Sequence, residues 1–206
     1  MSPGATMTRV YDTLKARIMA GEFAPSERLD PYRLAPELAT SPTPVREALH
    51  RLAGERLIES WQQEGFRQPH IIEPSIRDLY EWSSELLHVV LRAASSPVTR
   101  LEPTRSAPPP GYAARVADLF LDIALLSPNH EHRLAVISLN ERSALYRAAE
   151  ARILPDAADD VAAVETAVTE ARWSDAGVAL DHFHRRRLHM VGAIAGMLRS
   201  RPTGVR

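Results

Sequence analysis

The chain has 206 residues, with 25 lysines and arginines against 26 aspartates and glutamates, so its formal net charge is −1. Because there is no excess of positive charge, a nucleic-acid-binding surface would require the basic residues to lie together on one face. Cysteine is absent, which excludes disulfides and thiolate metal or redox sites. No apolar run reaches the length of a signal peptide or a membrane span, so we expect a cytoplasmic protein without a membrane partner.

Two short helices are predicted at the start of the chain. Residues 9–19 carry apolar side chains at i, i+4 and i+8, which is typical of a helix with one buried stripe, and Gly21 ends it. Asp30 suits the N-cap of a second helix, with Pro31 in its first turn. The buried positions expected for these helices are Val10, Leu14, Ile18, Leu34, Ala35 and Leu38.

A third helix is predicted to follow two closely spaced prolines and to end near Gly54. Thr43 is expected as its N-cap and Pro44 as its first residue, where the missing N–H costs nothing. Arg46 and His50 then face outwards near the N-terminal end, which suits a helix that enters the DNA major groove. An ordinary amphipathic helix with a solvated charged face is the competing interpretation. The core face is expected to hold Val45, Ala48, Leu49 and Leu52.

Two β-rich segments follow this helix. LIESW (57–61) and GFRQPHII (65–72) are separated by a short polar stretch that ends in Gly65, which indicates a hairpin. The order of helix, helix, turn, helix and hairpin predicts a winged helix-turn-helix domain over residues 1–73.

Only helical periodicity follows from Pro74 onwards. The proline-rich residues 95–110 are predicted to form a loop. One helix before this loop is expected to bury Ile76, Leu79, Ser83, Leu86 and Val90, and one after it Val116, Leu119, Phe120, Ile123 and Leu126. Further helices are predicted near residues 131–153, 156–172 and 174–199. The fold class is therefore mainly α, with a C-terminal all-α helical bundle over residues 74–206.

The chain contains the run GEFAPSERLDPYRLAPELATSPTPVREALHRLAGERLIES, of which PVREAL is the most specific part. This run resembles the N-terminal domain of GntR-family transcriptional regulators. LFLDIALLSPN is similar, more weakly, to the FadR-type subfamily in its FCD branch. The resemblance implies a DNA-binding repressor that dimerises through its helical domain, binds a near-palindromic double-stranded operator and responds to a small organic effector. It assigns an operator contact to Arg46 and the wing tip to Gly65.

The reading surface departs from the family pattern at several positions. Pro42 and Tyr32 stand where relatives usually carry DNA-contacting arginines, and Glu64 precedes the wing glycine, where a basic residue is common. Each lost contact weakens DNA binding. The alternative hypothesis is thus a protein-interaction or regulatory module that has lost specific DNA binding. The candidate DNA-binding residues are Arg33, Ser41, Thr43, Arg46, His50, Gly65 and Arg67.

The helical part is expected to sense the effector without a metal or another cofactor. Many members of the branch hold a divalent metal with one aspartate and three histidines, but the matching positions here are apolar: Val116, Phe120, Val161 and Phe183. The candidate effector pocket consists of Phe120, His184 and Arg187. Arg187 lies in an apolar helical stripe, so it reaches water, pairs with a partner such as Glu141, or binds an anionic effector.

We expect no enzymatic activity. The sequence contains no nucleophile–base pair, no phosphate-binding glycine loop and no zinc-type HExxH spacing. The histidines outside the candidate pocket are interpreted as scattered surface residues.

Overall fold

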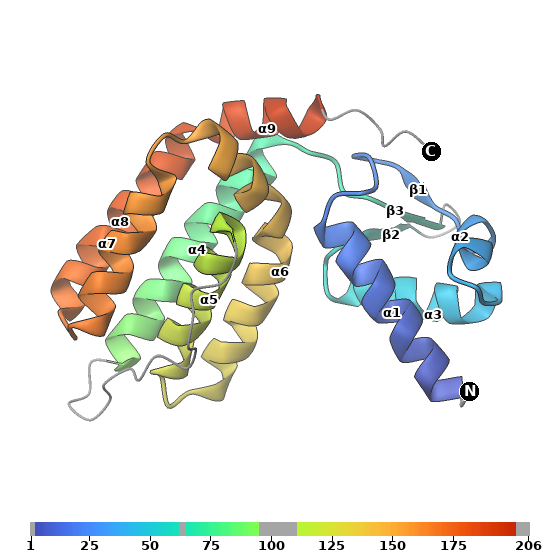
Figure 1. The fold of residues 1–206 in the computed structure, drawn as a ribbon, viewed down its shortest axis with the longest axis horizontal. Coiled ribbons are helices and arrows are strands. Elements are labelled where there is room, and N and C mark those ends of the chain that lie inside the picture. Colours follow the sequence, from blue (N-terminus) through green and yellow to red (C-terminus); the bar gives the residue numbers. More distant parts are fainter. Residues whose placement is uncertain (1–2, 62–64, 95–110, 201–206) are drawn as a thin grey trace. The chain divides into compact units, whose positions relative to one another are not determined.

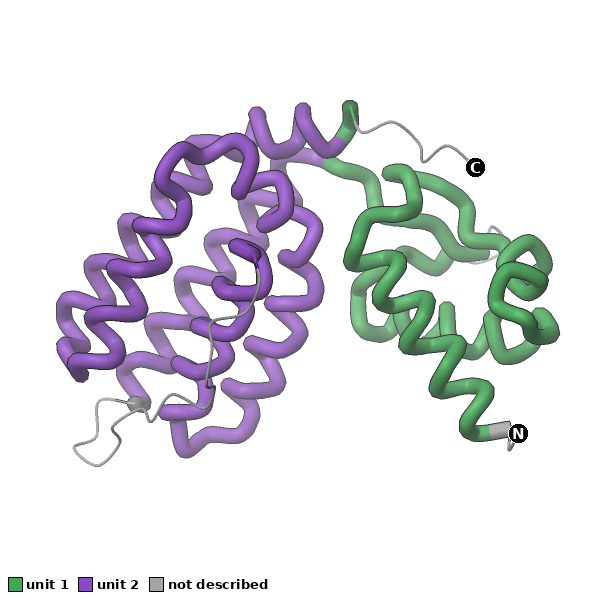
Figure 2. The backbone as a smooth tube through the Cα atoms, viewed as in Figure 1, with its two compact units in different colours: residues 1–71, 199–206 green, residues 72–198 purple. Residues whose placement is uncertain are grey.

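The structure is a computed structural model that describes residues 3–61, 65–94 and 111–200. The chain divides into two compact units, one of residues 1–71 with 199–206 (unit 1) and one of residues 72–198 (unit 2), coloured separately in Figure 2. Within the described ranges, no helix has both the length and the apolar character needed to cross a bilayer.

Unit 1 is a winged helix-turn-helix domain, as predicted (Figure 1). Its elements run α1 (Pro3–Met19), β1 (Arg28–Leu29), α2 (Pro31–Glu37), α3 (Pro42–Gly54), β2 (Glu59–Trp61) and β3 (Gly65–Arg67). The strands form one antiparallel sheet in the order β1-β3-β2. Strand β1 was not predicted, because two residues are too short to show a sequence period. The two outer strands pair with β3 through Leu29↔Phe66 and Ser60↔Phe66.

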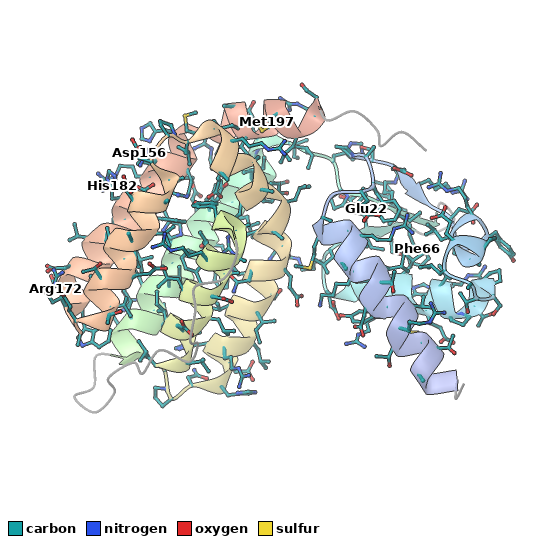
Figure 3. All side chains as sticks on the ribbon, viewed as in Figure 1. Glu22, Phe66, Asp156, Arg172, His182 and Met197 are labelled. Carbon is teal, nitrogen blue, oxygen red and sulfur yellow. The ribbon has the colours of Figure 1, made fainter. Side chains whose placement is uncertain are left out.

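The core of unit 1 lies between the helices and the sheet. The predicted inward positions of α1, α2 and α3 are all buried, and Phe66 from β3 joins them (Figure 3). Asp30 caps α2 as predicted, since its side chain accepts a hydrogen bond from the Tyr32 N–H at 2.9 Å. The strands are shorter than the predicted β-rich segments, and the predicted turn at residues 62–64 lies outside the described residues.

The start of α3 differs from the prediction. Ser41 is the N-cap, in extended geometry and without a side-chain capping bond, and Pro42 is the first helical residue. Thr43 and Pro44 therefore both lie inside the helix. The physical reason is that none of the first N–H groups of a helix has an intrahelical partner, so either proline can occupy the first turn. Local sequence rules could not choose between the two registers.

Unit 2 is all-α, and its helices α4 to α8 run alongside one another as a bundle (Figure 1). Its core contains the inward residues predicted for α4 and α5, and the predicted loop at 95–110 lies outside the described residues. The helices are α4 (Glu73–Ala94), α5 (Tyr112–Leu125), α6 (His130–Ile153), α7 (Ala157–Thr169), α8 (Trp173–His189) and α9 (Val191–Arg199).

The single helix predicted over residues 174–199 is wrong, because the chain breaks at Met190 into α8 and α9. The Met190 N–H donates to Arg187 O in a tight final turn, while its own carbonyl accepts from Ile194 N and opens the next helix. The apolar spacing continues across the break, so periodicity alone could not reveal it.

Candidate functional site

The two faces of α3 are sorted as the sequence predicts. Its four core residues are fully buried, whereas Ser41, Thr43, Arg46 and His50 are all exposed. Arg46 and His50 are one helical turn apart, so they share one side of the outward face. The N-terminal half of α3 therefore presents polar and charged side chains to solvent, including the acidic Glu47 beside Arg46.

Arg46 is exposed and faces the ring of Tyr32. Within the described part of the chain, no hydrogen bond or ion pair engages its guanidinium, which lies 5.9 Å from the ring centroid of Tyr32. Tyr32 is 67% exposed at the start of α2. The sequence analysis did not include Tyr32 among the site residues, although a large exposed aromatic side chain is itself a signal of binding.

The other end of α3 carries charges that compensate one another. Arg51 Nε lies 3.2 Å from Glu55 Oε1, and its guanidinium stacks 3.7 Å from the centroid of the Tyr11 ring. Lys15 reaches the second oxygen of Glu55 at 3.0 Å. The free positive charge of the helix is thus confined to Arg46, close to the helix N-terminus.

The wing packs against α3 through His50. Its ring meets the buried Phe66 of β3 edge-on, with centroids 4.8 Å apart. The Arg67 guanidinium lies 5.0 Å from the Trp61 ring on the neighbouring strand, and Trp61 is 51% exposed. Gly65 has φ +85°, which only glycine adopts without strain. His50 therefore contacts the wing as well as facing outwards.

Arg33 differs from the other candidates because it already forms an ion pair with Glu27. Its Nη2 lies 2.6 Å from Glu27 Oε1, and its Nε is buried with no hydrogen-bond partner in the described residues. The structure brings Ser41, Thr43, Arg46 and His50 together on α3 and leaves Arg33 tied to the segment before α2.

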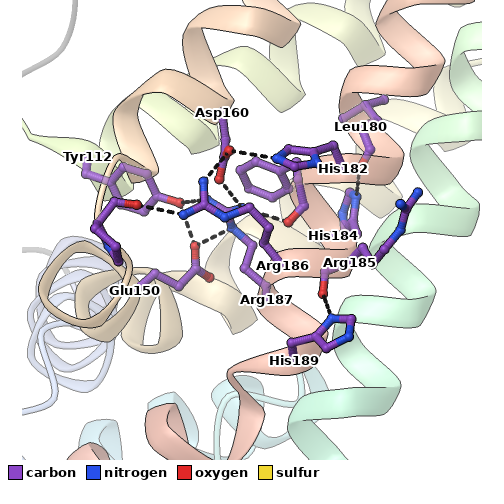
Figure 4. A network of polar contacts seen from close by, with 12 residues as sticks. Tyr112, Glu150, Asp160, Leu180, His182, His184, Arg185, Arg186, Arg187 and His189 are labelled. Carbon is purple, nitrogen blue, oxygen red and sulfur yellow. Dashed lines mark hydrogen bonds and ion pairs between the residues drawn. The ribbon is translucent and has the colours of Figure 1, made fainter.

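In unit 2, Arg187 is completely buried and fully paired (Figure 4). Its Nε donates to Glu150 Oε2 and its Nη1 to Asp160 Oδ2, both at 2.9 Å. Further donations reach Phe183 O at 2.7 Å and Tyr112 Oη at 2.5 Å. The sequence analysis left an internal pair open but named Glu141, whereas the partners are Glu150 on α6 and Asp160 on α7.

The Glu150 carboxylate accepts hydrogen bonds at both of its oxygens. The Tyr80 hydroxyl donates to Oε1 and the Tyr112 hydroxyl to Oε2, each at 2.6 Å. Burial, together with the Glu150 charge, raises the pKa of both tyrosines, so the two hydroxyls keep their protons as donors. This buried network of Tyr80, Tyr112, Glu150, Asp160 and Arg187 joins the five helices α4 to α8.

His184 is a satisfied core histidine. Its Nδ1 lies 2.8 Å from Leu180 O, a pure acceptor, so Nδ1 donates and Nε2 accepts from Ser83 Oγ at 2.9 Å. Burial lowers the pKa of His184 to about 3, so the ring is neutral at neutral pH. Phe120 stacks on it with a centroid distance of 6.1 Å. Two of the predicted pocket residues, Phe120 and His184, are thus in direct contact.

The sequence analysis missed Arg147 on α6. Its side chain is 3% exposed, its guanidinium lies 4.9 Å from the Phe120 ring centroid, and Nη1 has no hydrogen-bond partner in the described chain. Burial lowers the pKa of Arg147 to about 10, against the raising effect of Glu150. No apolar stripe marked Arg147 in the sequence, because its inward neighbours on α6 are themselves polar.

The positions matched to the metal ligands of related proteins lie in one apolar cluster of unit 2. Phe120 and Phe183 meet edge-on there, with centroids 5.5 Å apart. In residues 3–61, 65–94 and 111–200, no three histidine or carboxylate side chains gather in a position to hold a metal ion. The four matched residues are Val116, Phe120, Val161 and Phe183.

Solved structures share this fold over nearly the whole chain. Escherichia coli McbR/YncC has a TM-score of 0.65 at 16% identity, covering 91% of this chain and 97% of that protein. A putative transcriptional regulator GntR from Rhodococcus sp. RHA1 has a TM-score of 0.67 at 19% identity, covering 92% and 98%.

Comparison of sequences finds relatives that match part of the chain. The chain is 35% identical over 71 residues to the HTH-type transcriptional repressor GlaR of Escherichia coli (strain K12), covering 34% of this chain and 32% of that protein. It is 35% identical over 80 residues to the Nta operon transcriptional regulator of Aminobacter aminovorans, covering 39% and 38%. It thus spans about a third of the length of these curated relatives. Residues 6–67, less than half of the chain, match the family described as bacterial regulatory proteins, gntR family.

Proposed function

We propose that this protein is a DNA-binding transcriptional repressor that reads a double-stranded operator with the exposed face of α3. The observation that carries the proposal is the solvent-exposed Arg46 near the N-terminus of α3, whose other face is anchored in the core. Among the described residues, the Arg46 guanidinium has no hydrogen bond or ion pair. An arginine in this place can reach guanine or phosphate, and the helix N-terminus favours an approaching phosphate.

The relatives support this proposal. GlaR is named a transcriptional repressor and the Aminobacter protein an operon regulator, and residues 6–67 match a family of bacterial regulatory proteins. The wing residues Gly65 and Arg67 follow α3 in the chain and pack against it through Phe66. We expect Gly65 and Arg67 to contact the DNA backbone beside the reading helix.

We assign residues 1–73 to DNA binding and residues 74–206 to effector sensing and dimerisation. A homodimer would present two copies of α3 to a near-palindromic operator. A small organic effector in the helical unit would change DNA affinity by favouring one arrangement of the domains.

The test is a gel-shift assay with the DNA upstream of the protein's own gene. R46A is expected to weaken specific binding by about 5- to 150-fold, because one bidentate arginine contact contributes about 1–3 kcal/mol of discrimination. R51A is the matched control, since Arg51 is an exposed arginine on the same helix that is already paired with Glu55. Equal binding by R46A and wild type would overturn the assignment.

The exposed Tyr32 and Trp61 favour one alternative, a protein-interaction module that has lost DNA binding. Exposed aromatic side chains are enriched in protein interfaces. Under this alternative, the wild-type protein would show no sequence-specific shift, and R46A would change nothing.

A further inference from the structure

We propose that a pocket on the outside of unit 2, between α8 and the turn that joins α6 to α7, binds a small phosphate monoester. The pocket has a volume of about 460 Å³. Sites for small molecules usually measure about 300–1,000 Å³, so this pocket has room for one such ligand. The inference goes beyond the proposed function and does not depend on it.

One face of α8 supplies the cationic side chains of this pocket. His182, Arg185, Arg186 and His189 follow the spacing i, i+3, i+4 and i+7, which places them on one side of the helix (Figure 4). All four line the pocket, and no aspartate or glutamate of the described residues lines it with them. A lining with positive charge and hydrogen-bond donors favours an anion.

Arg186 forms part of the pocket wall and is already paired. Its Nη1 lies 2.6 Å from Asp160 Oδ1, and its Nη2 donates to Pro155 O at 2.7 Å. Asp160 is buried, and its other oxygen accepts from Arg187 at 2.9 Å. These contacts join α8 to the start of α7 and to the turn before it. The pocket wall is therefore fixed before a ligand arrives.

Arg185 is the cation that remains for the ligand. Its side chain is exposed, and no hydrogen bond or ion pair engages its guanidinium within the described part of the chain. The nearby Asp160 carboxylate is shared by Arg186 and Arg187, so it does not compensate Arg185. An exposed arginine is ordinary by itself, but this one borders a pocket together with two histidines. Arginine binds phosphate through several parallel N–H donors.

The two histidines lie on either side of Arg185 along α8. His189 Nδ1 lies 2.7 Å from Arg185 O, a pure acceptor, so Nδ1 donates and Nε2 is available to a ligand. The His182 side chain is 61% exposed, and its Nε2 lies 3.6 Å from Asp160 Oδ1. A phosphoryl group has three acceptor oxygens, whereas a carboxylate has two. One arginine flanked by two imidazoles therefore suits a phosphoryl group better.

The other residues that line the pocket are apolar. They are Leu154 and Pro155 at the end of α6 and Met190 at the end of α8. Inorganic phosphate would leave these side chains in contact with water, whereas an aromatic or aliphatic body would cover them. The lining therefore favours a monoester over the free anion.

Isothermal titration calorimetry of the full chain in a phosphate-free buffer tests the inference. The probes are phenyl phosphate, inorganic phosphate and phenol. Phenyl phosphate should bind at one site per chain, inorganic phosphate should bind more weakly, and phenol should give no saturable heat. Equal affinities for phenyl phosphate and inorganic phosphate would overturn the assignment to an ester. No saturable heat from phenyl phosphate in the millimolar range would overturn the site itself.

Variants of Arg185 place the ligand. R185M should weaken phenyl phosphate binding by about tenfold or more, because it removes hydrogen bonds between charged groups. R133M is the matched control, since Arg133 on α6 is exposed but does not line the pocket, and it should bind like wild type. The double variant H182Q/H189Q should bind more weakly than wild type but more tightly than R185M, because glutamine keeps a neutral donor.

Two outcomes of the variant series would overturn the proposal. Unchanged binding by R185M would show that the ligand lies elsewhere, and an equal loss in R133M would show that it responds only to overall charge. R185M should unfold at the same temperature as wild type, which separates a lost contact from a lost fold. R46A should bind phenyl phosphate like wild type, so a failure of DNA binding is distinguishable from a failure of this site.

Discussion

The outward face of α3 and the interior of the helical bundle place arginines in opposite surroundings, and each contains one paired and one unpaired guanidinium. On α3, Arg51 is held by Glu55 while Arg46 has no ion pair in the described chain. In the bundle, Arg187 has four hydrogen-bond acceptors, while Arg147 contacts the Phe120 ring and its Nη1 has no hydrogen-bond partner among the described residues. Water solvates the unpaired charge on the surface, so leaving Arg46 free costs little. In the bundle an unpaired guanidinium costs more, because bulk water does not solvate a buried cation.

We infer that an arginine's role is better indicated by its partners than by its burial. An arginine with internal partners is expected to stabilise the fold, and one without them is expected to bind another molecule. The paired residues Arg51 and Arg187 hold parts of the fold together. Among the described residues, the guanidinium of Arg46 and Nη1 of Arg147 have no hydrogen-bond acceptor. The predictions below test this division, first inside the bundle and then on the surface.

The largest effect is expected from breaking the paired arginine of the bundle. R187M should lower the free energy of unfolding by about 3–5 kcal/mol, because it leaves the buried Glu150 without its ion-pair partner and removes one of the two arginines paired with Asp160. Urea unfolding at neutral pH measures the loss. R147M is the matched control with the same substitution, and its loss should be close to zero. Equal losses in the two variants would contradict the division into structural and binding arginines.

His184 makes the stability of the bundle depend on pH. Its folded pKa of about 3 lies below the ordinary histidine value of about 6.5, so between these values the unfolded chain binds a proton that the folded chain does not. Stability therefore falls as pH falls below about 6.5, and this loss is complete near the folded pKa.

The expected loss from this group between neutral pH and pH 5 is about 2 kcal/mol. Comparing urea unfolding of wild type and H184Q at both pH values isolates it, because glutamine retains a donor and an acceptor but does not titrate. The same pH dependence in both proteins would show that His184 is not the group responsible.

On the wing, we expect backbone geometry to affect the free energy of unfolding more than side-chain contacts do. Gly65 has φ +85°, and a Cβ there meets nothing within 4 Å, so G65A should cost about 1–2 kcal/mol from backbone strain alone. Gly54, at the end of α3, also has open space but no positive φ. G54A should instead stabilise unit 1 by about 0.5–1 kcal/mol. Urea unfolding of both variants should therefore give changes of opposite sign.

The smallest effect is expected at Tyr32. An exposed cation–π contact contributes about 0.5–1 kcal/mol, so Y32A should weaken operator binding two- to fivefold by releasing Arg46. Y32F keeps the ring and should bind like wild type in a fluorescence anisotropy titration. If Y32F binds as weakly as Y32A, the hydroxyl itself contacts DNA and the ring is not the cause.

Much of unit 1 could be predicted from the sequence, because its signals are local. The Asp30 cap and the apolar spacing of α3 each involve residues within a few positions of one another. The same rules failed at the start of α3, where two prolines were equally compatible with a first turn, and at Met190, where the apolar spacing continues through a break in the backbone. Strand β1 exists because Leu29 lies opposite Phe66 in the fold.

The sequence by itself determined which faces of the helices are buried, because helical and strand periods follow from backbone geometry. It also determined that Arg187 lies in an apolar stripe. Only the tertiary structure decided that Arg187 is paired and Arg147 is not. The reason is that Glu150, Asp160 and Arg187 lie on three different helices, and their meeting depends on how those helices pack. A buried charge is neutralised by neighbours in space, and spacing along one helix does not identify them.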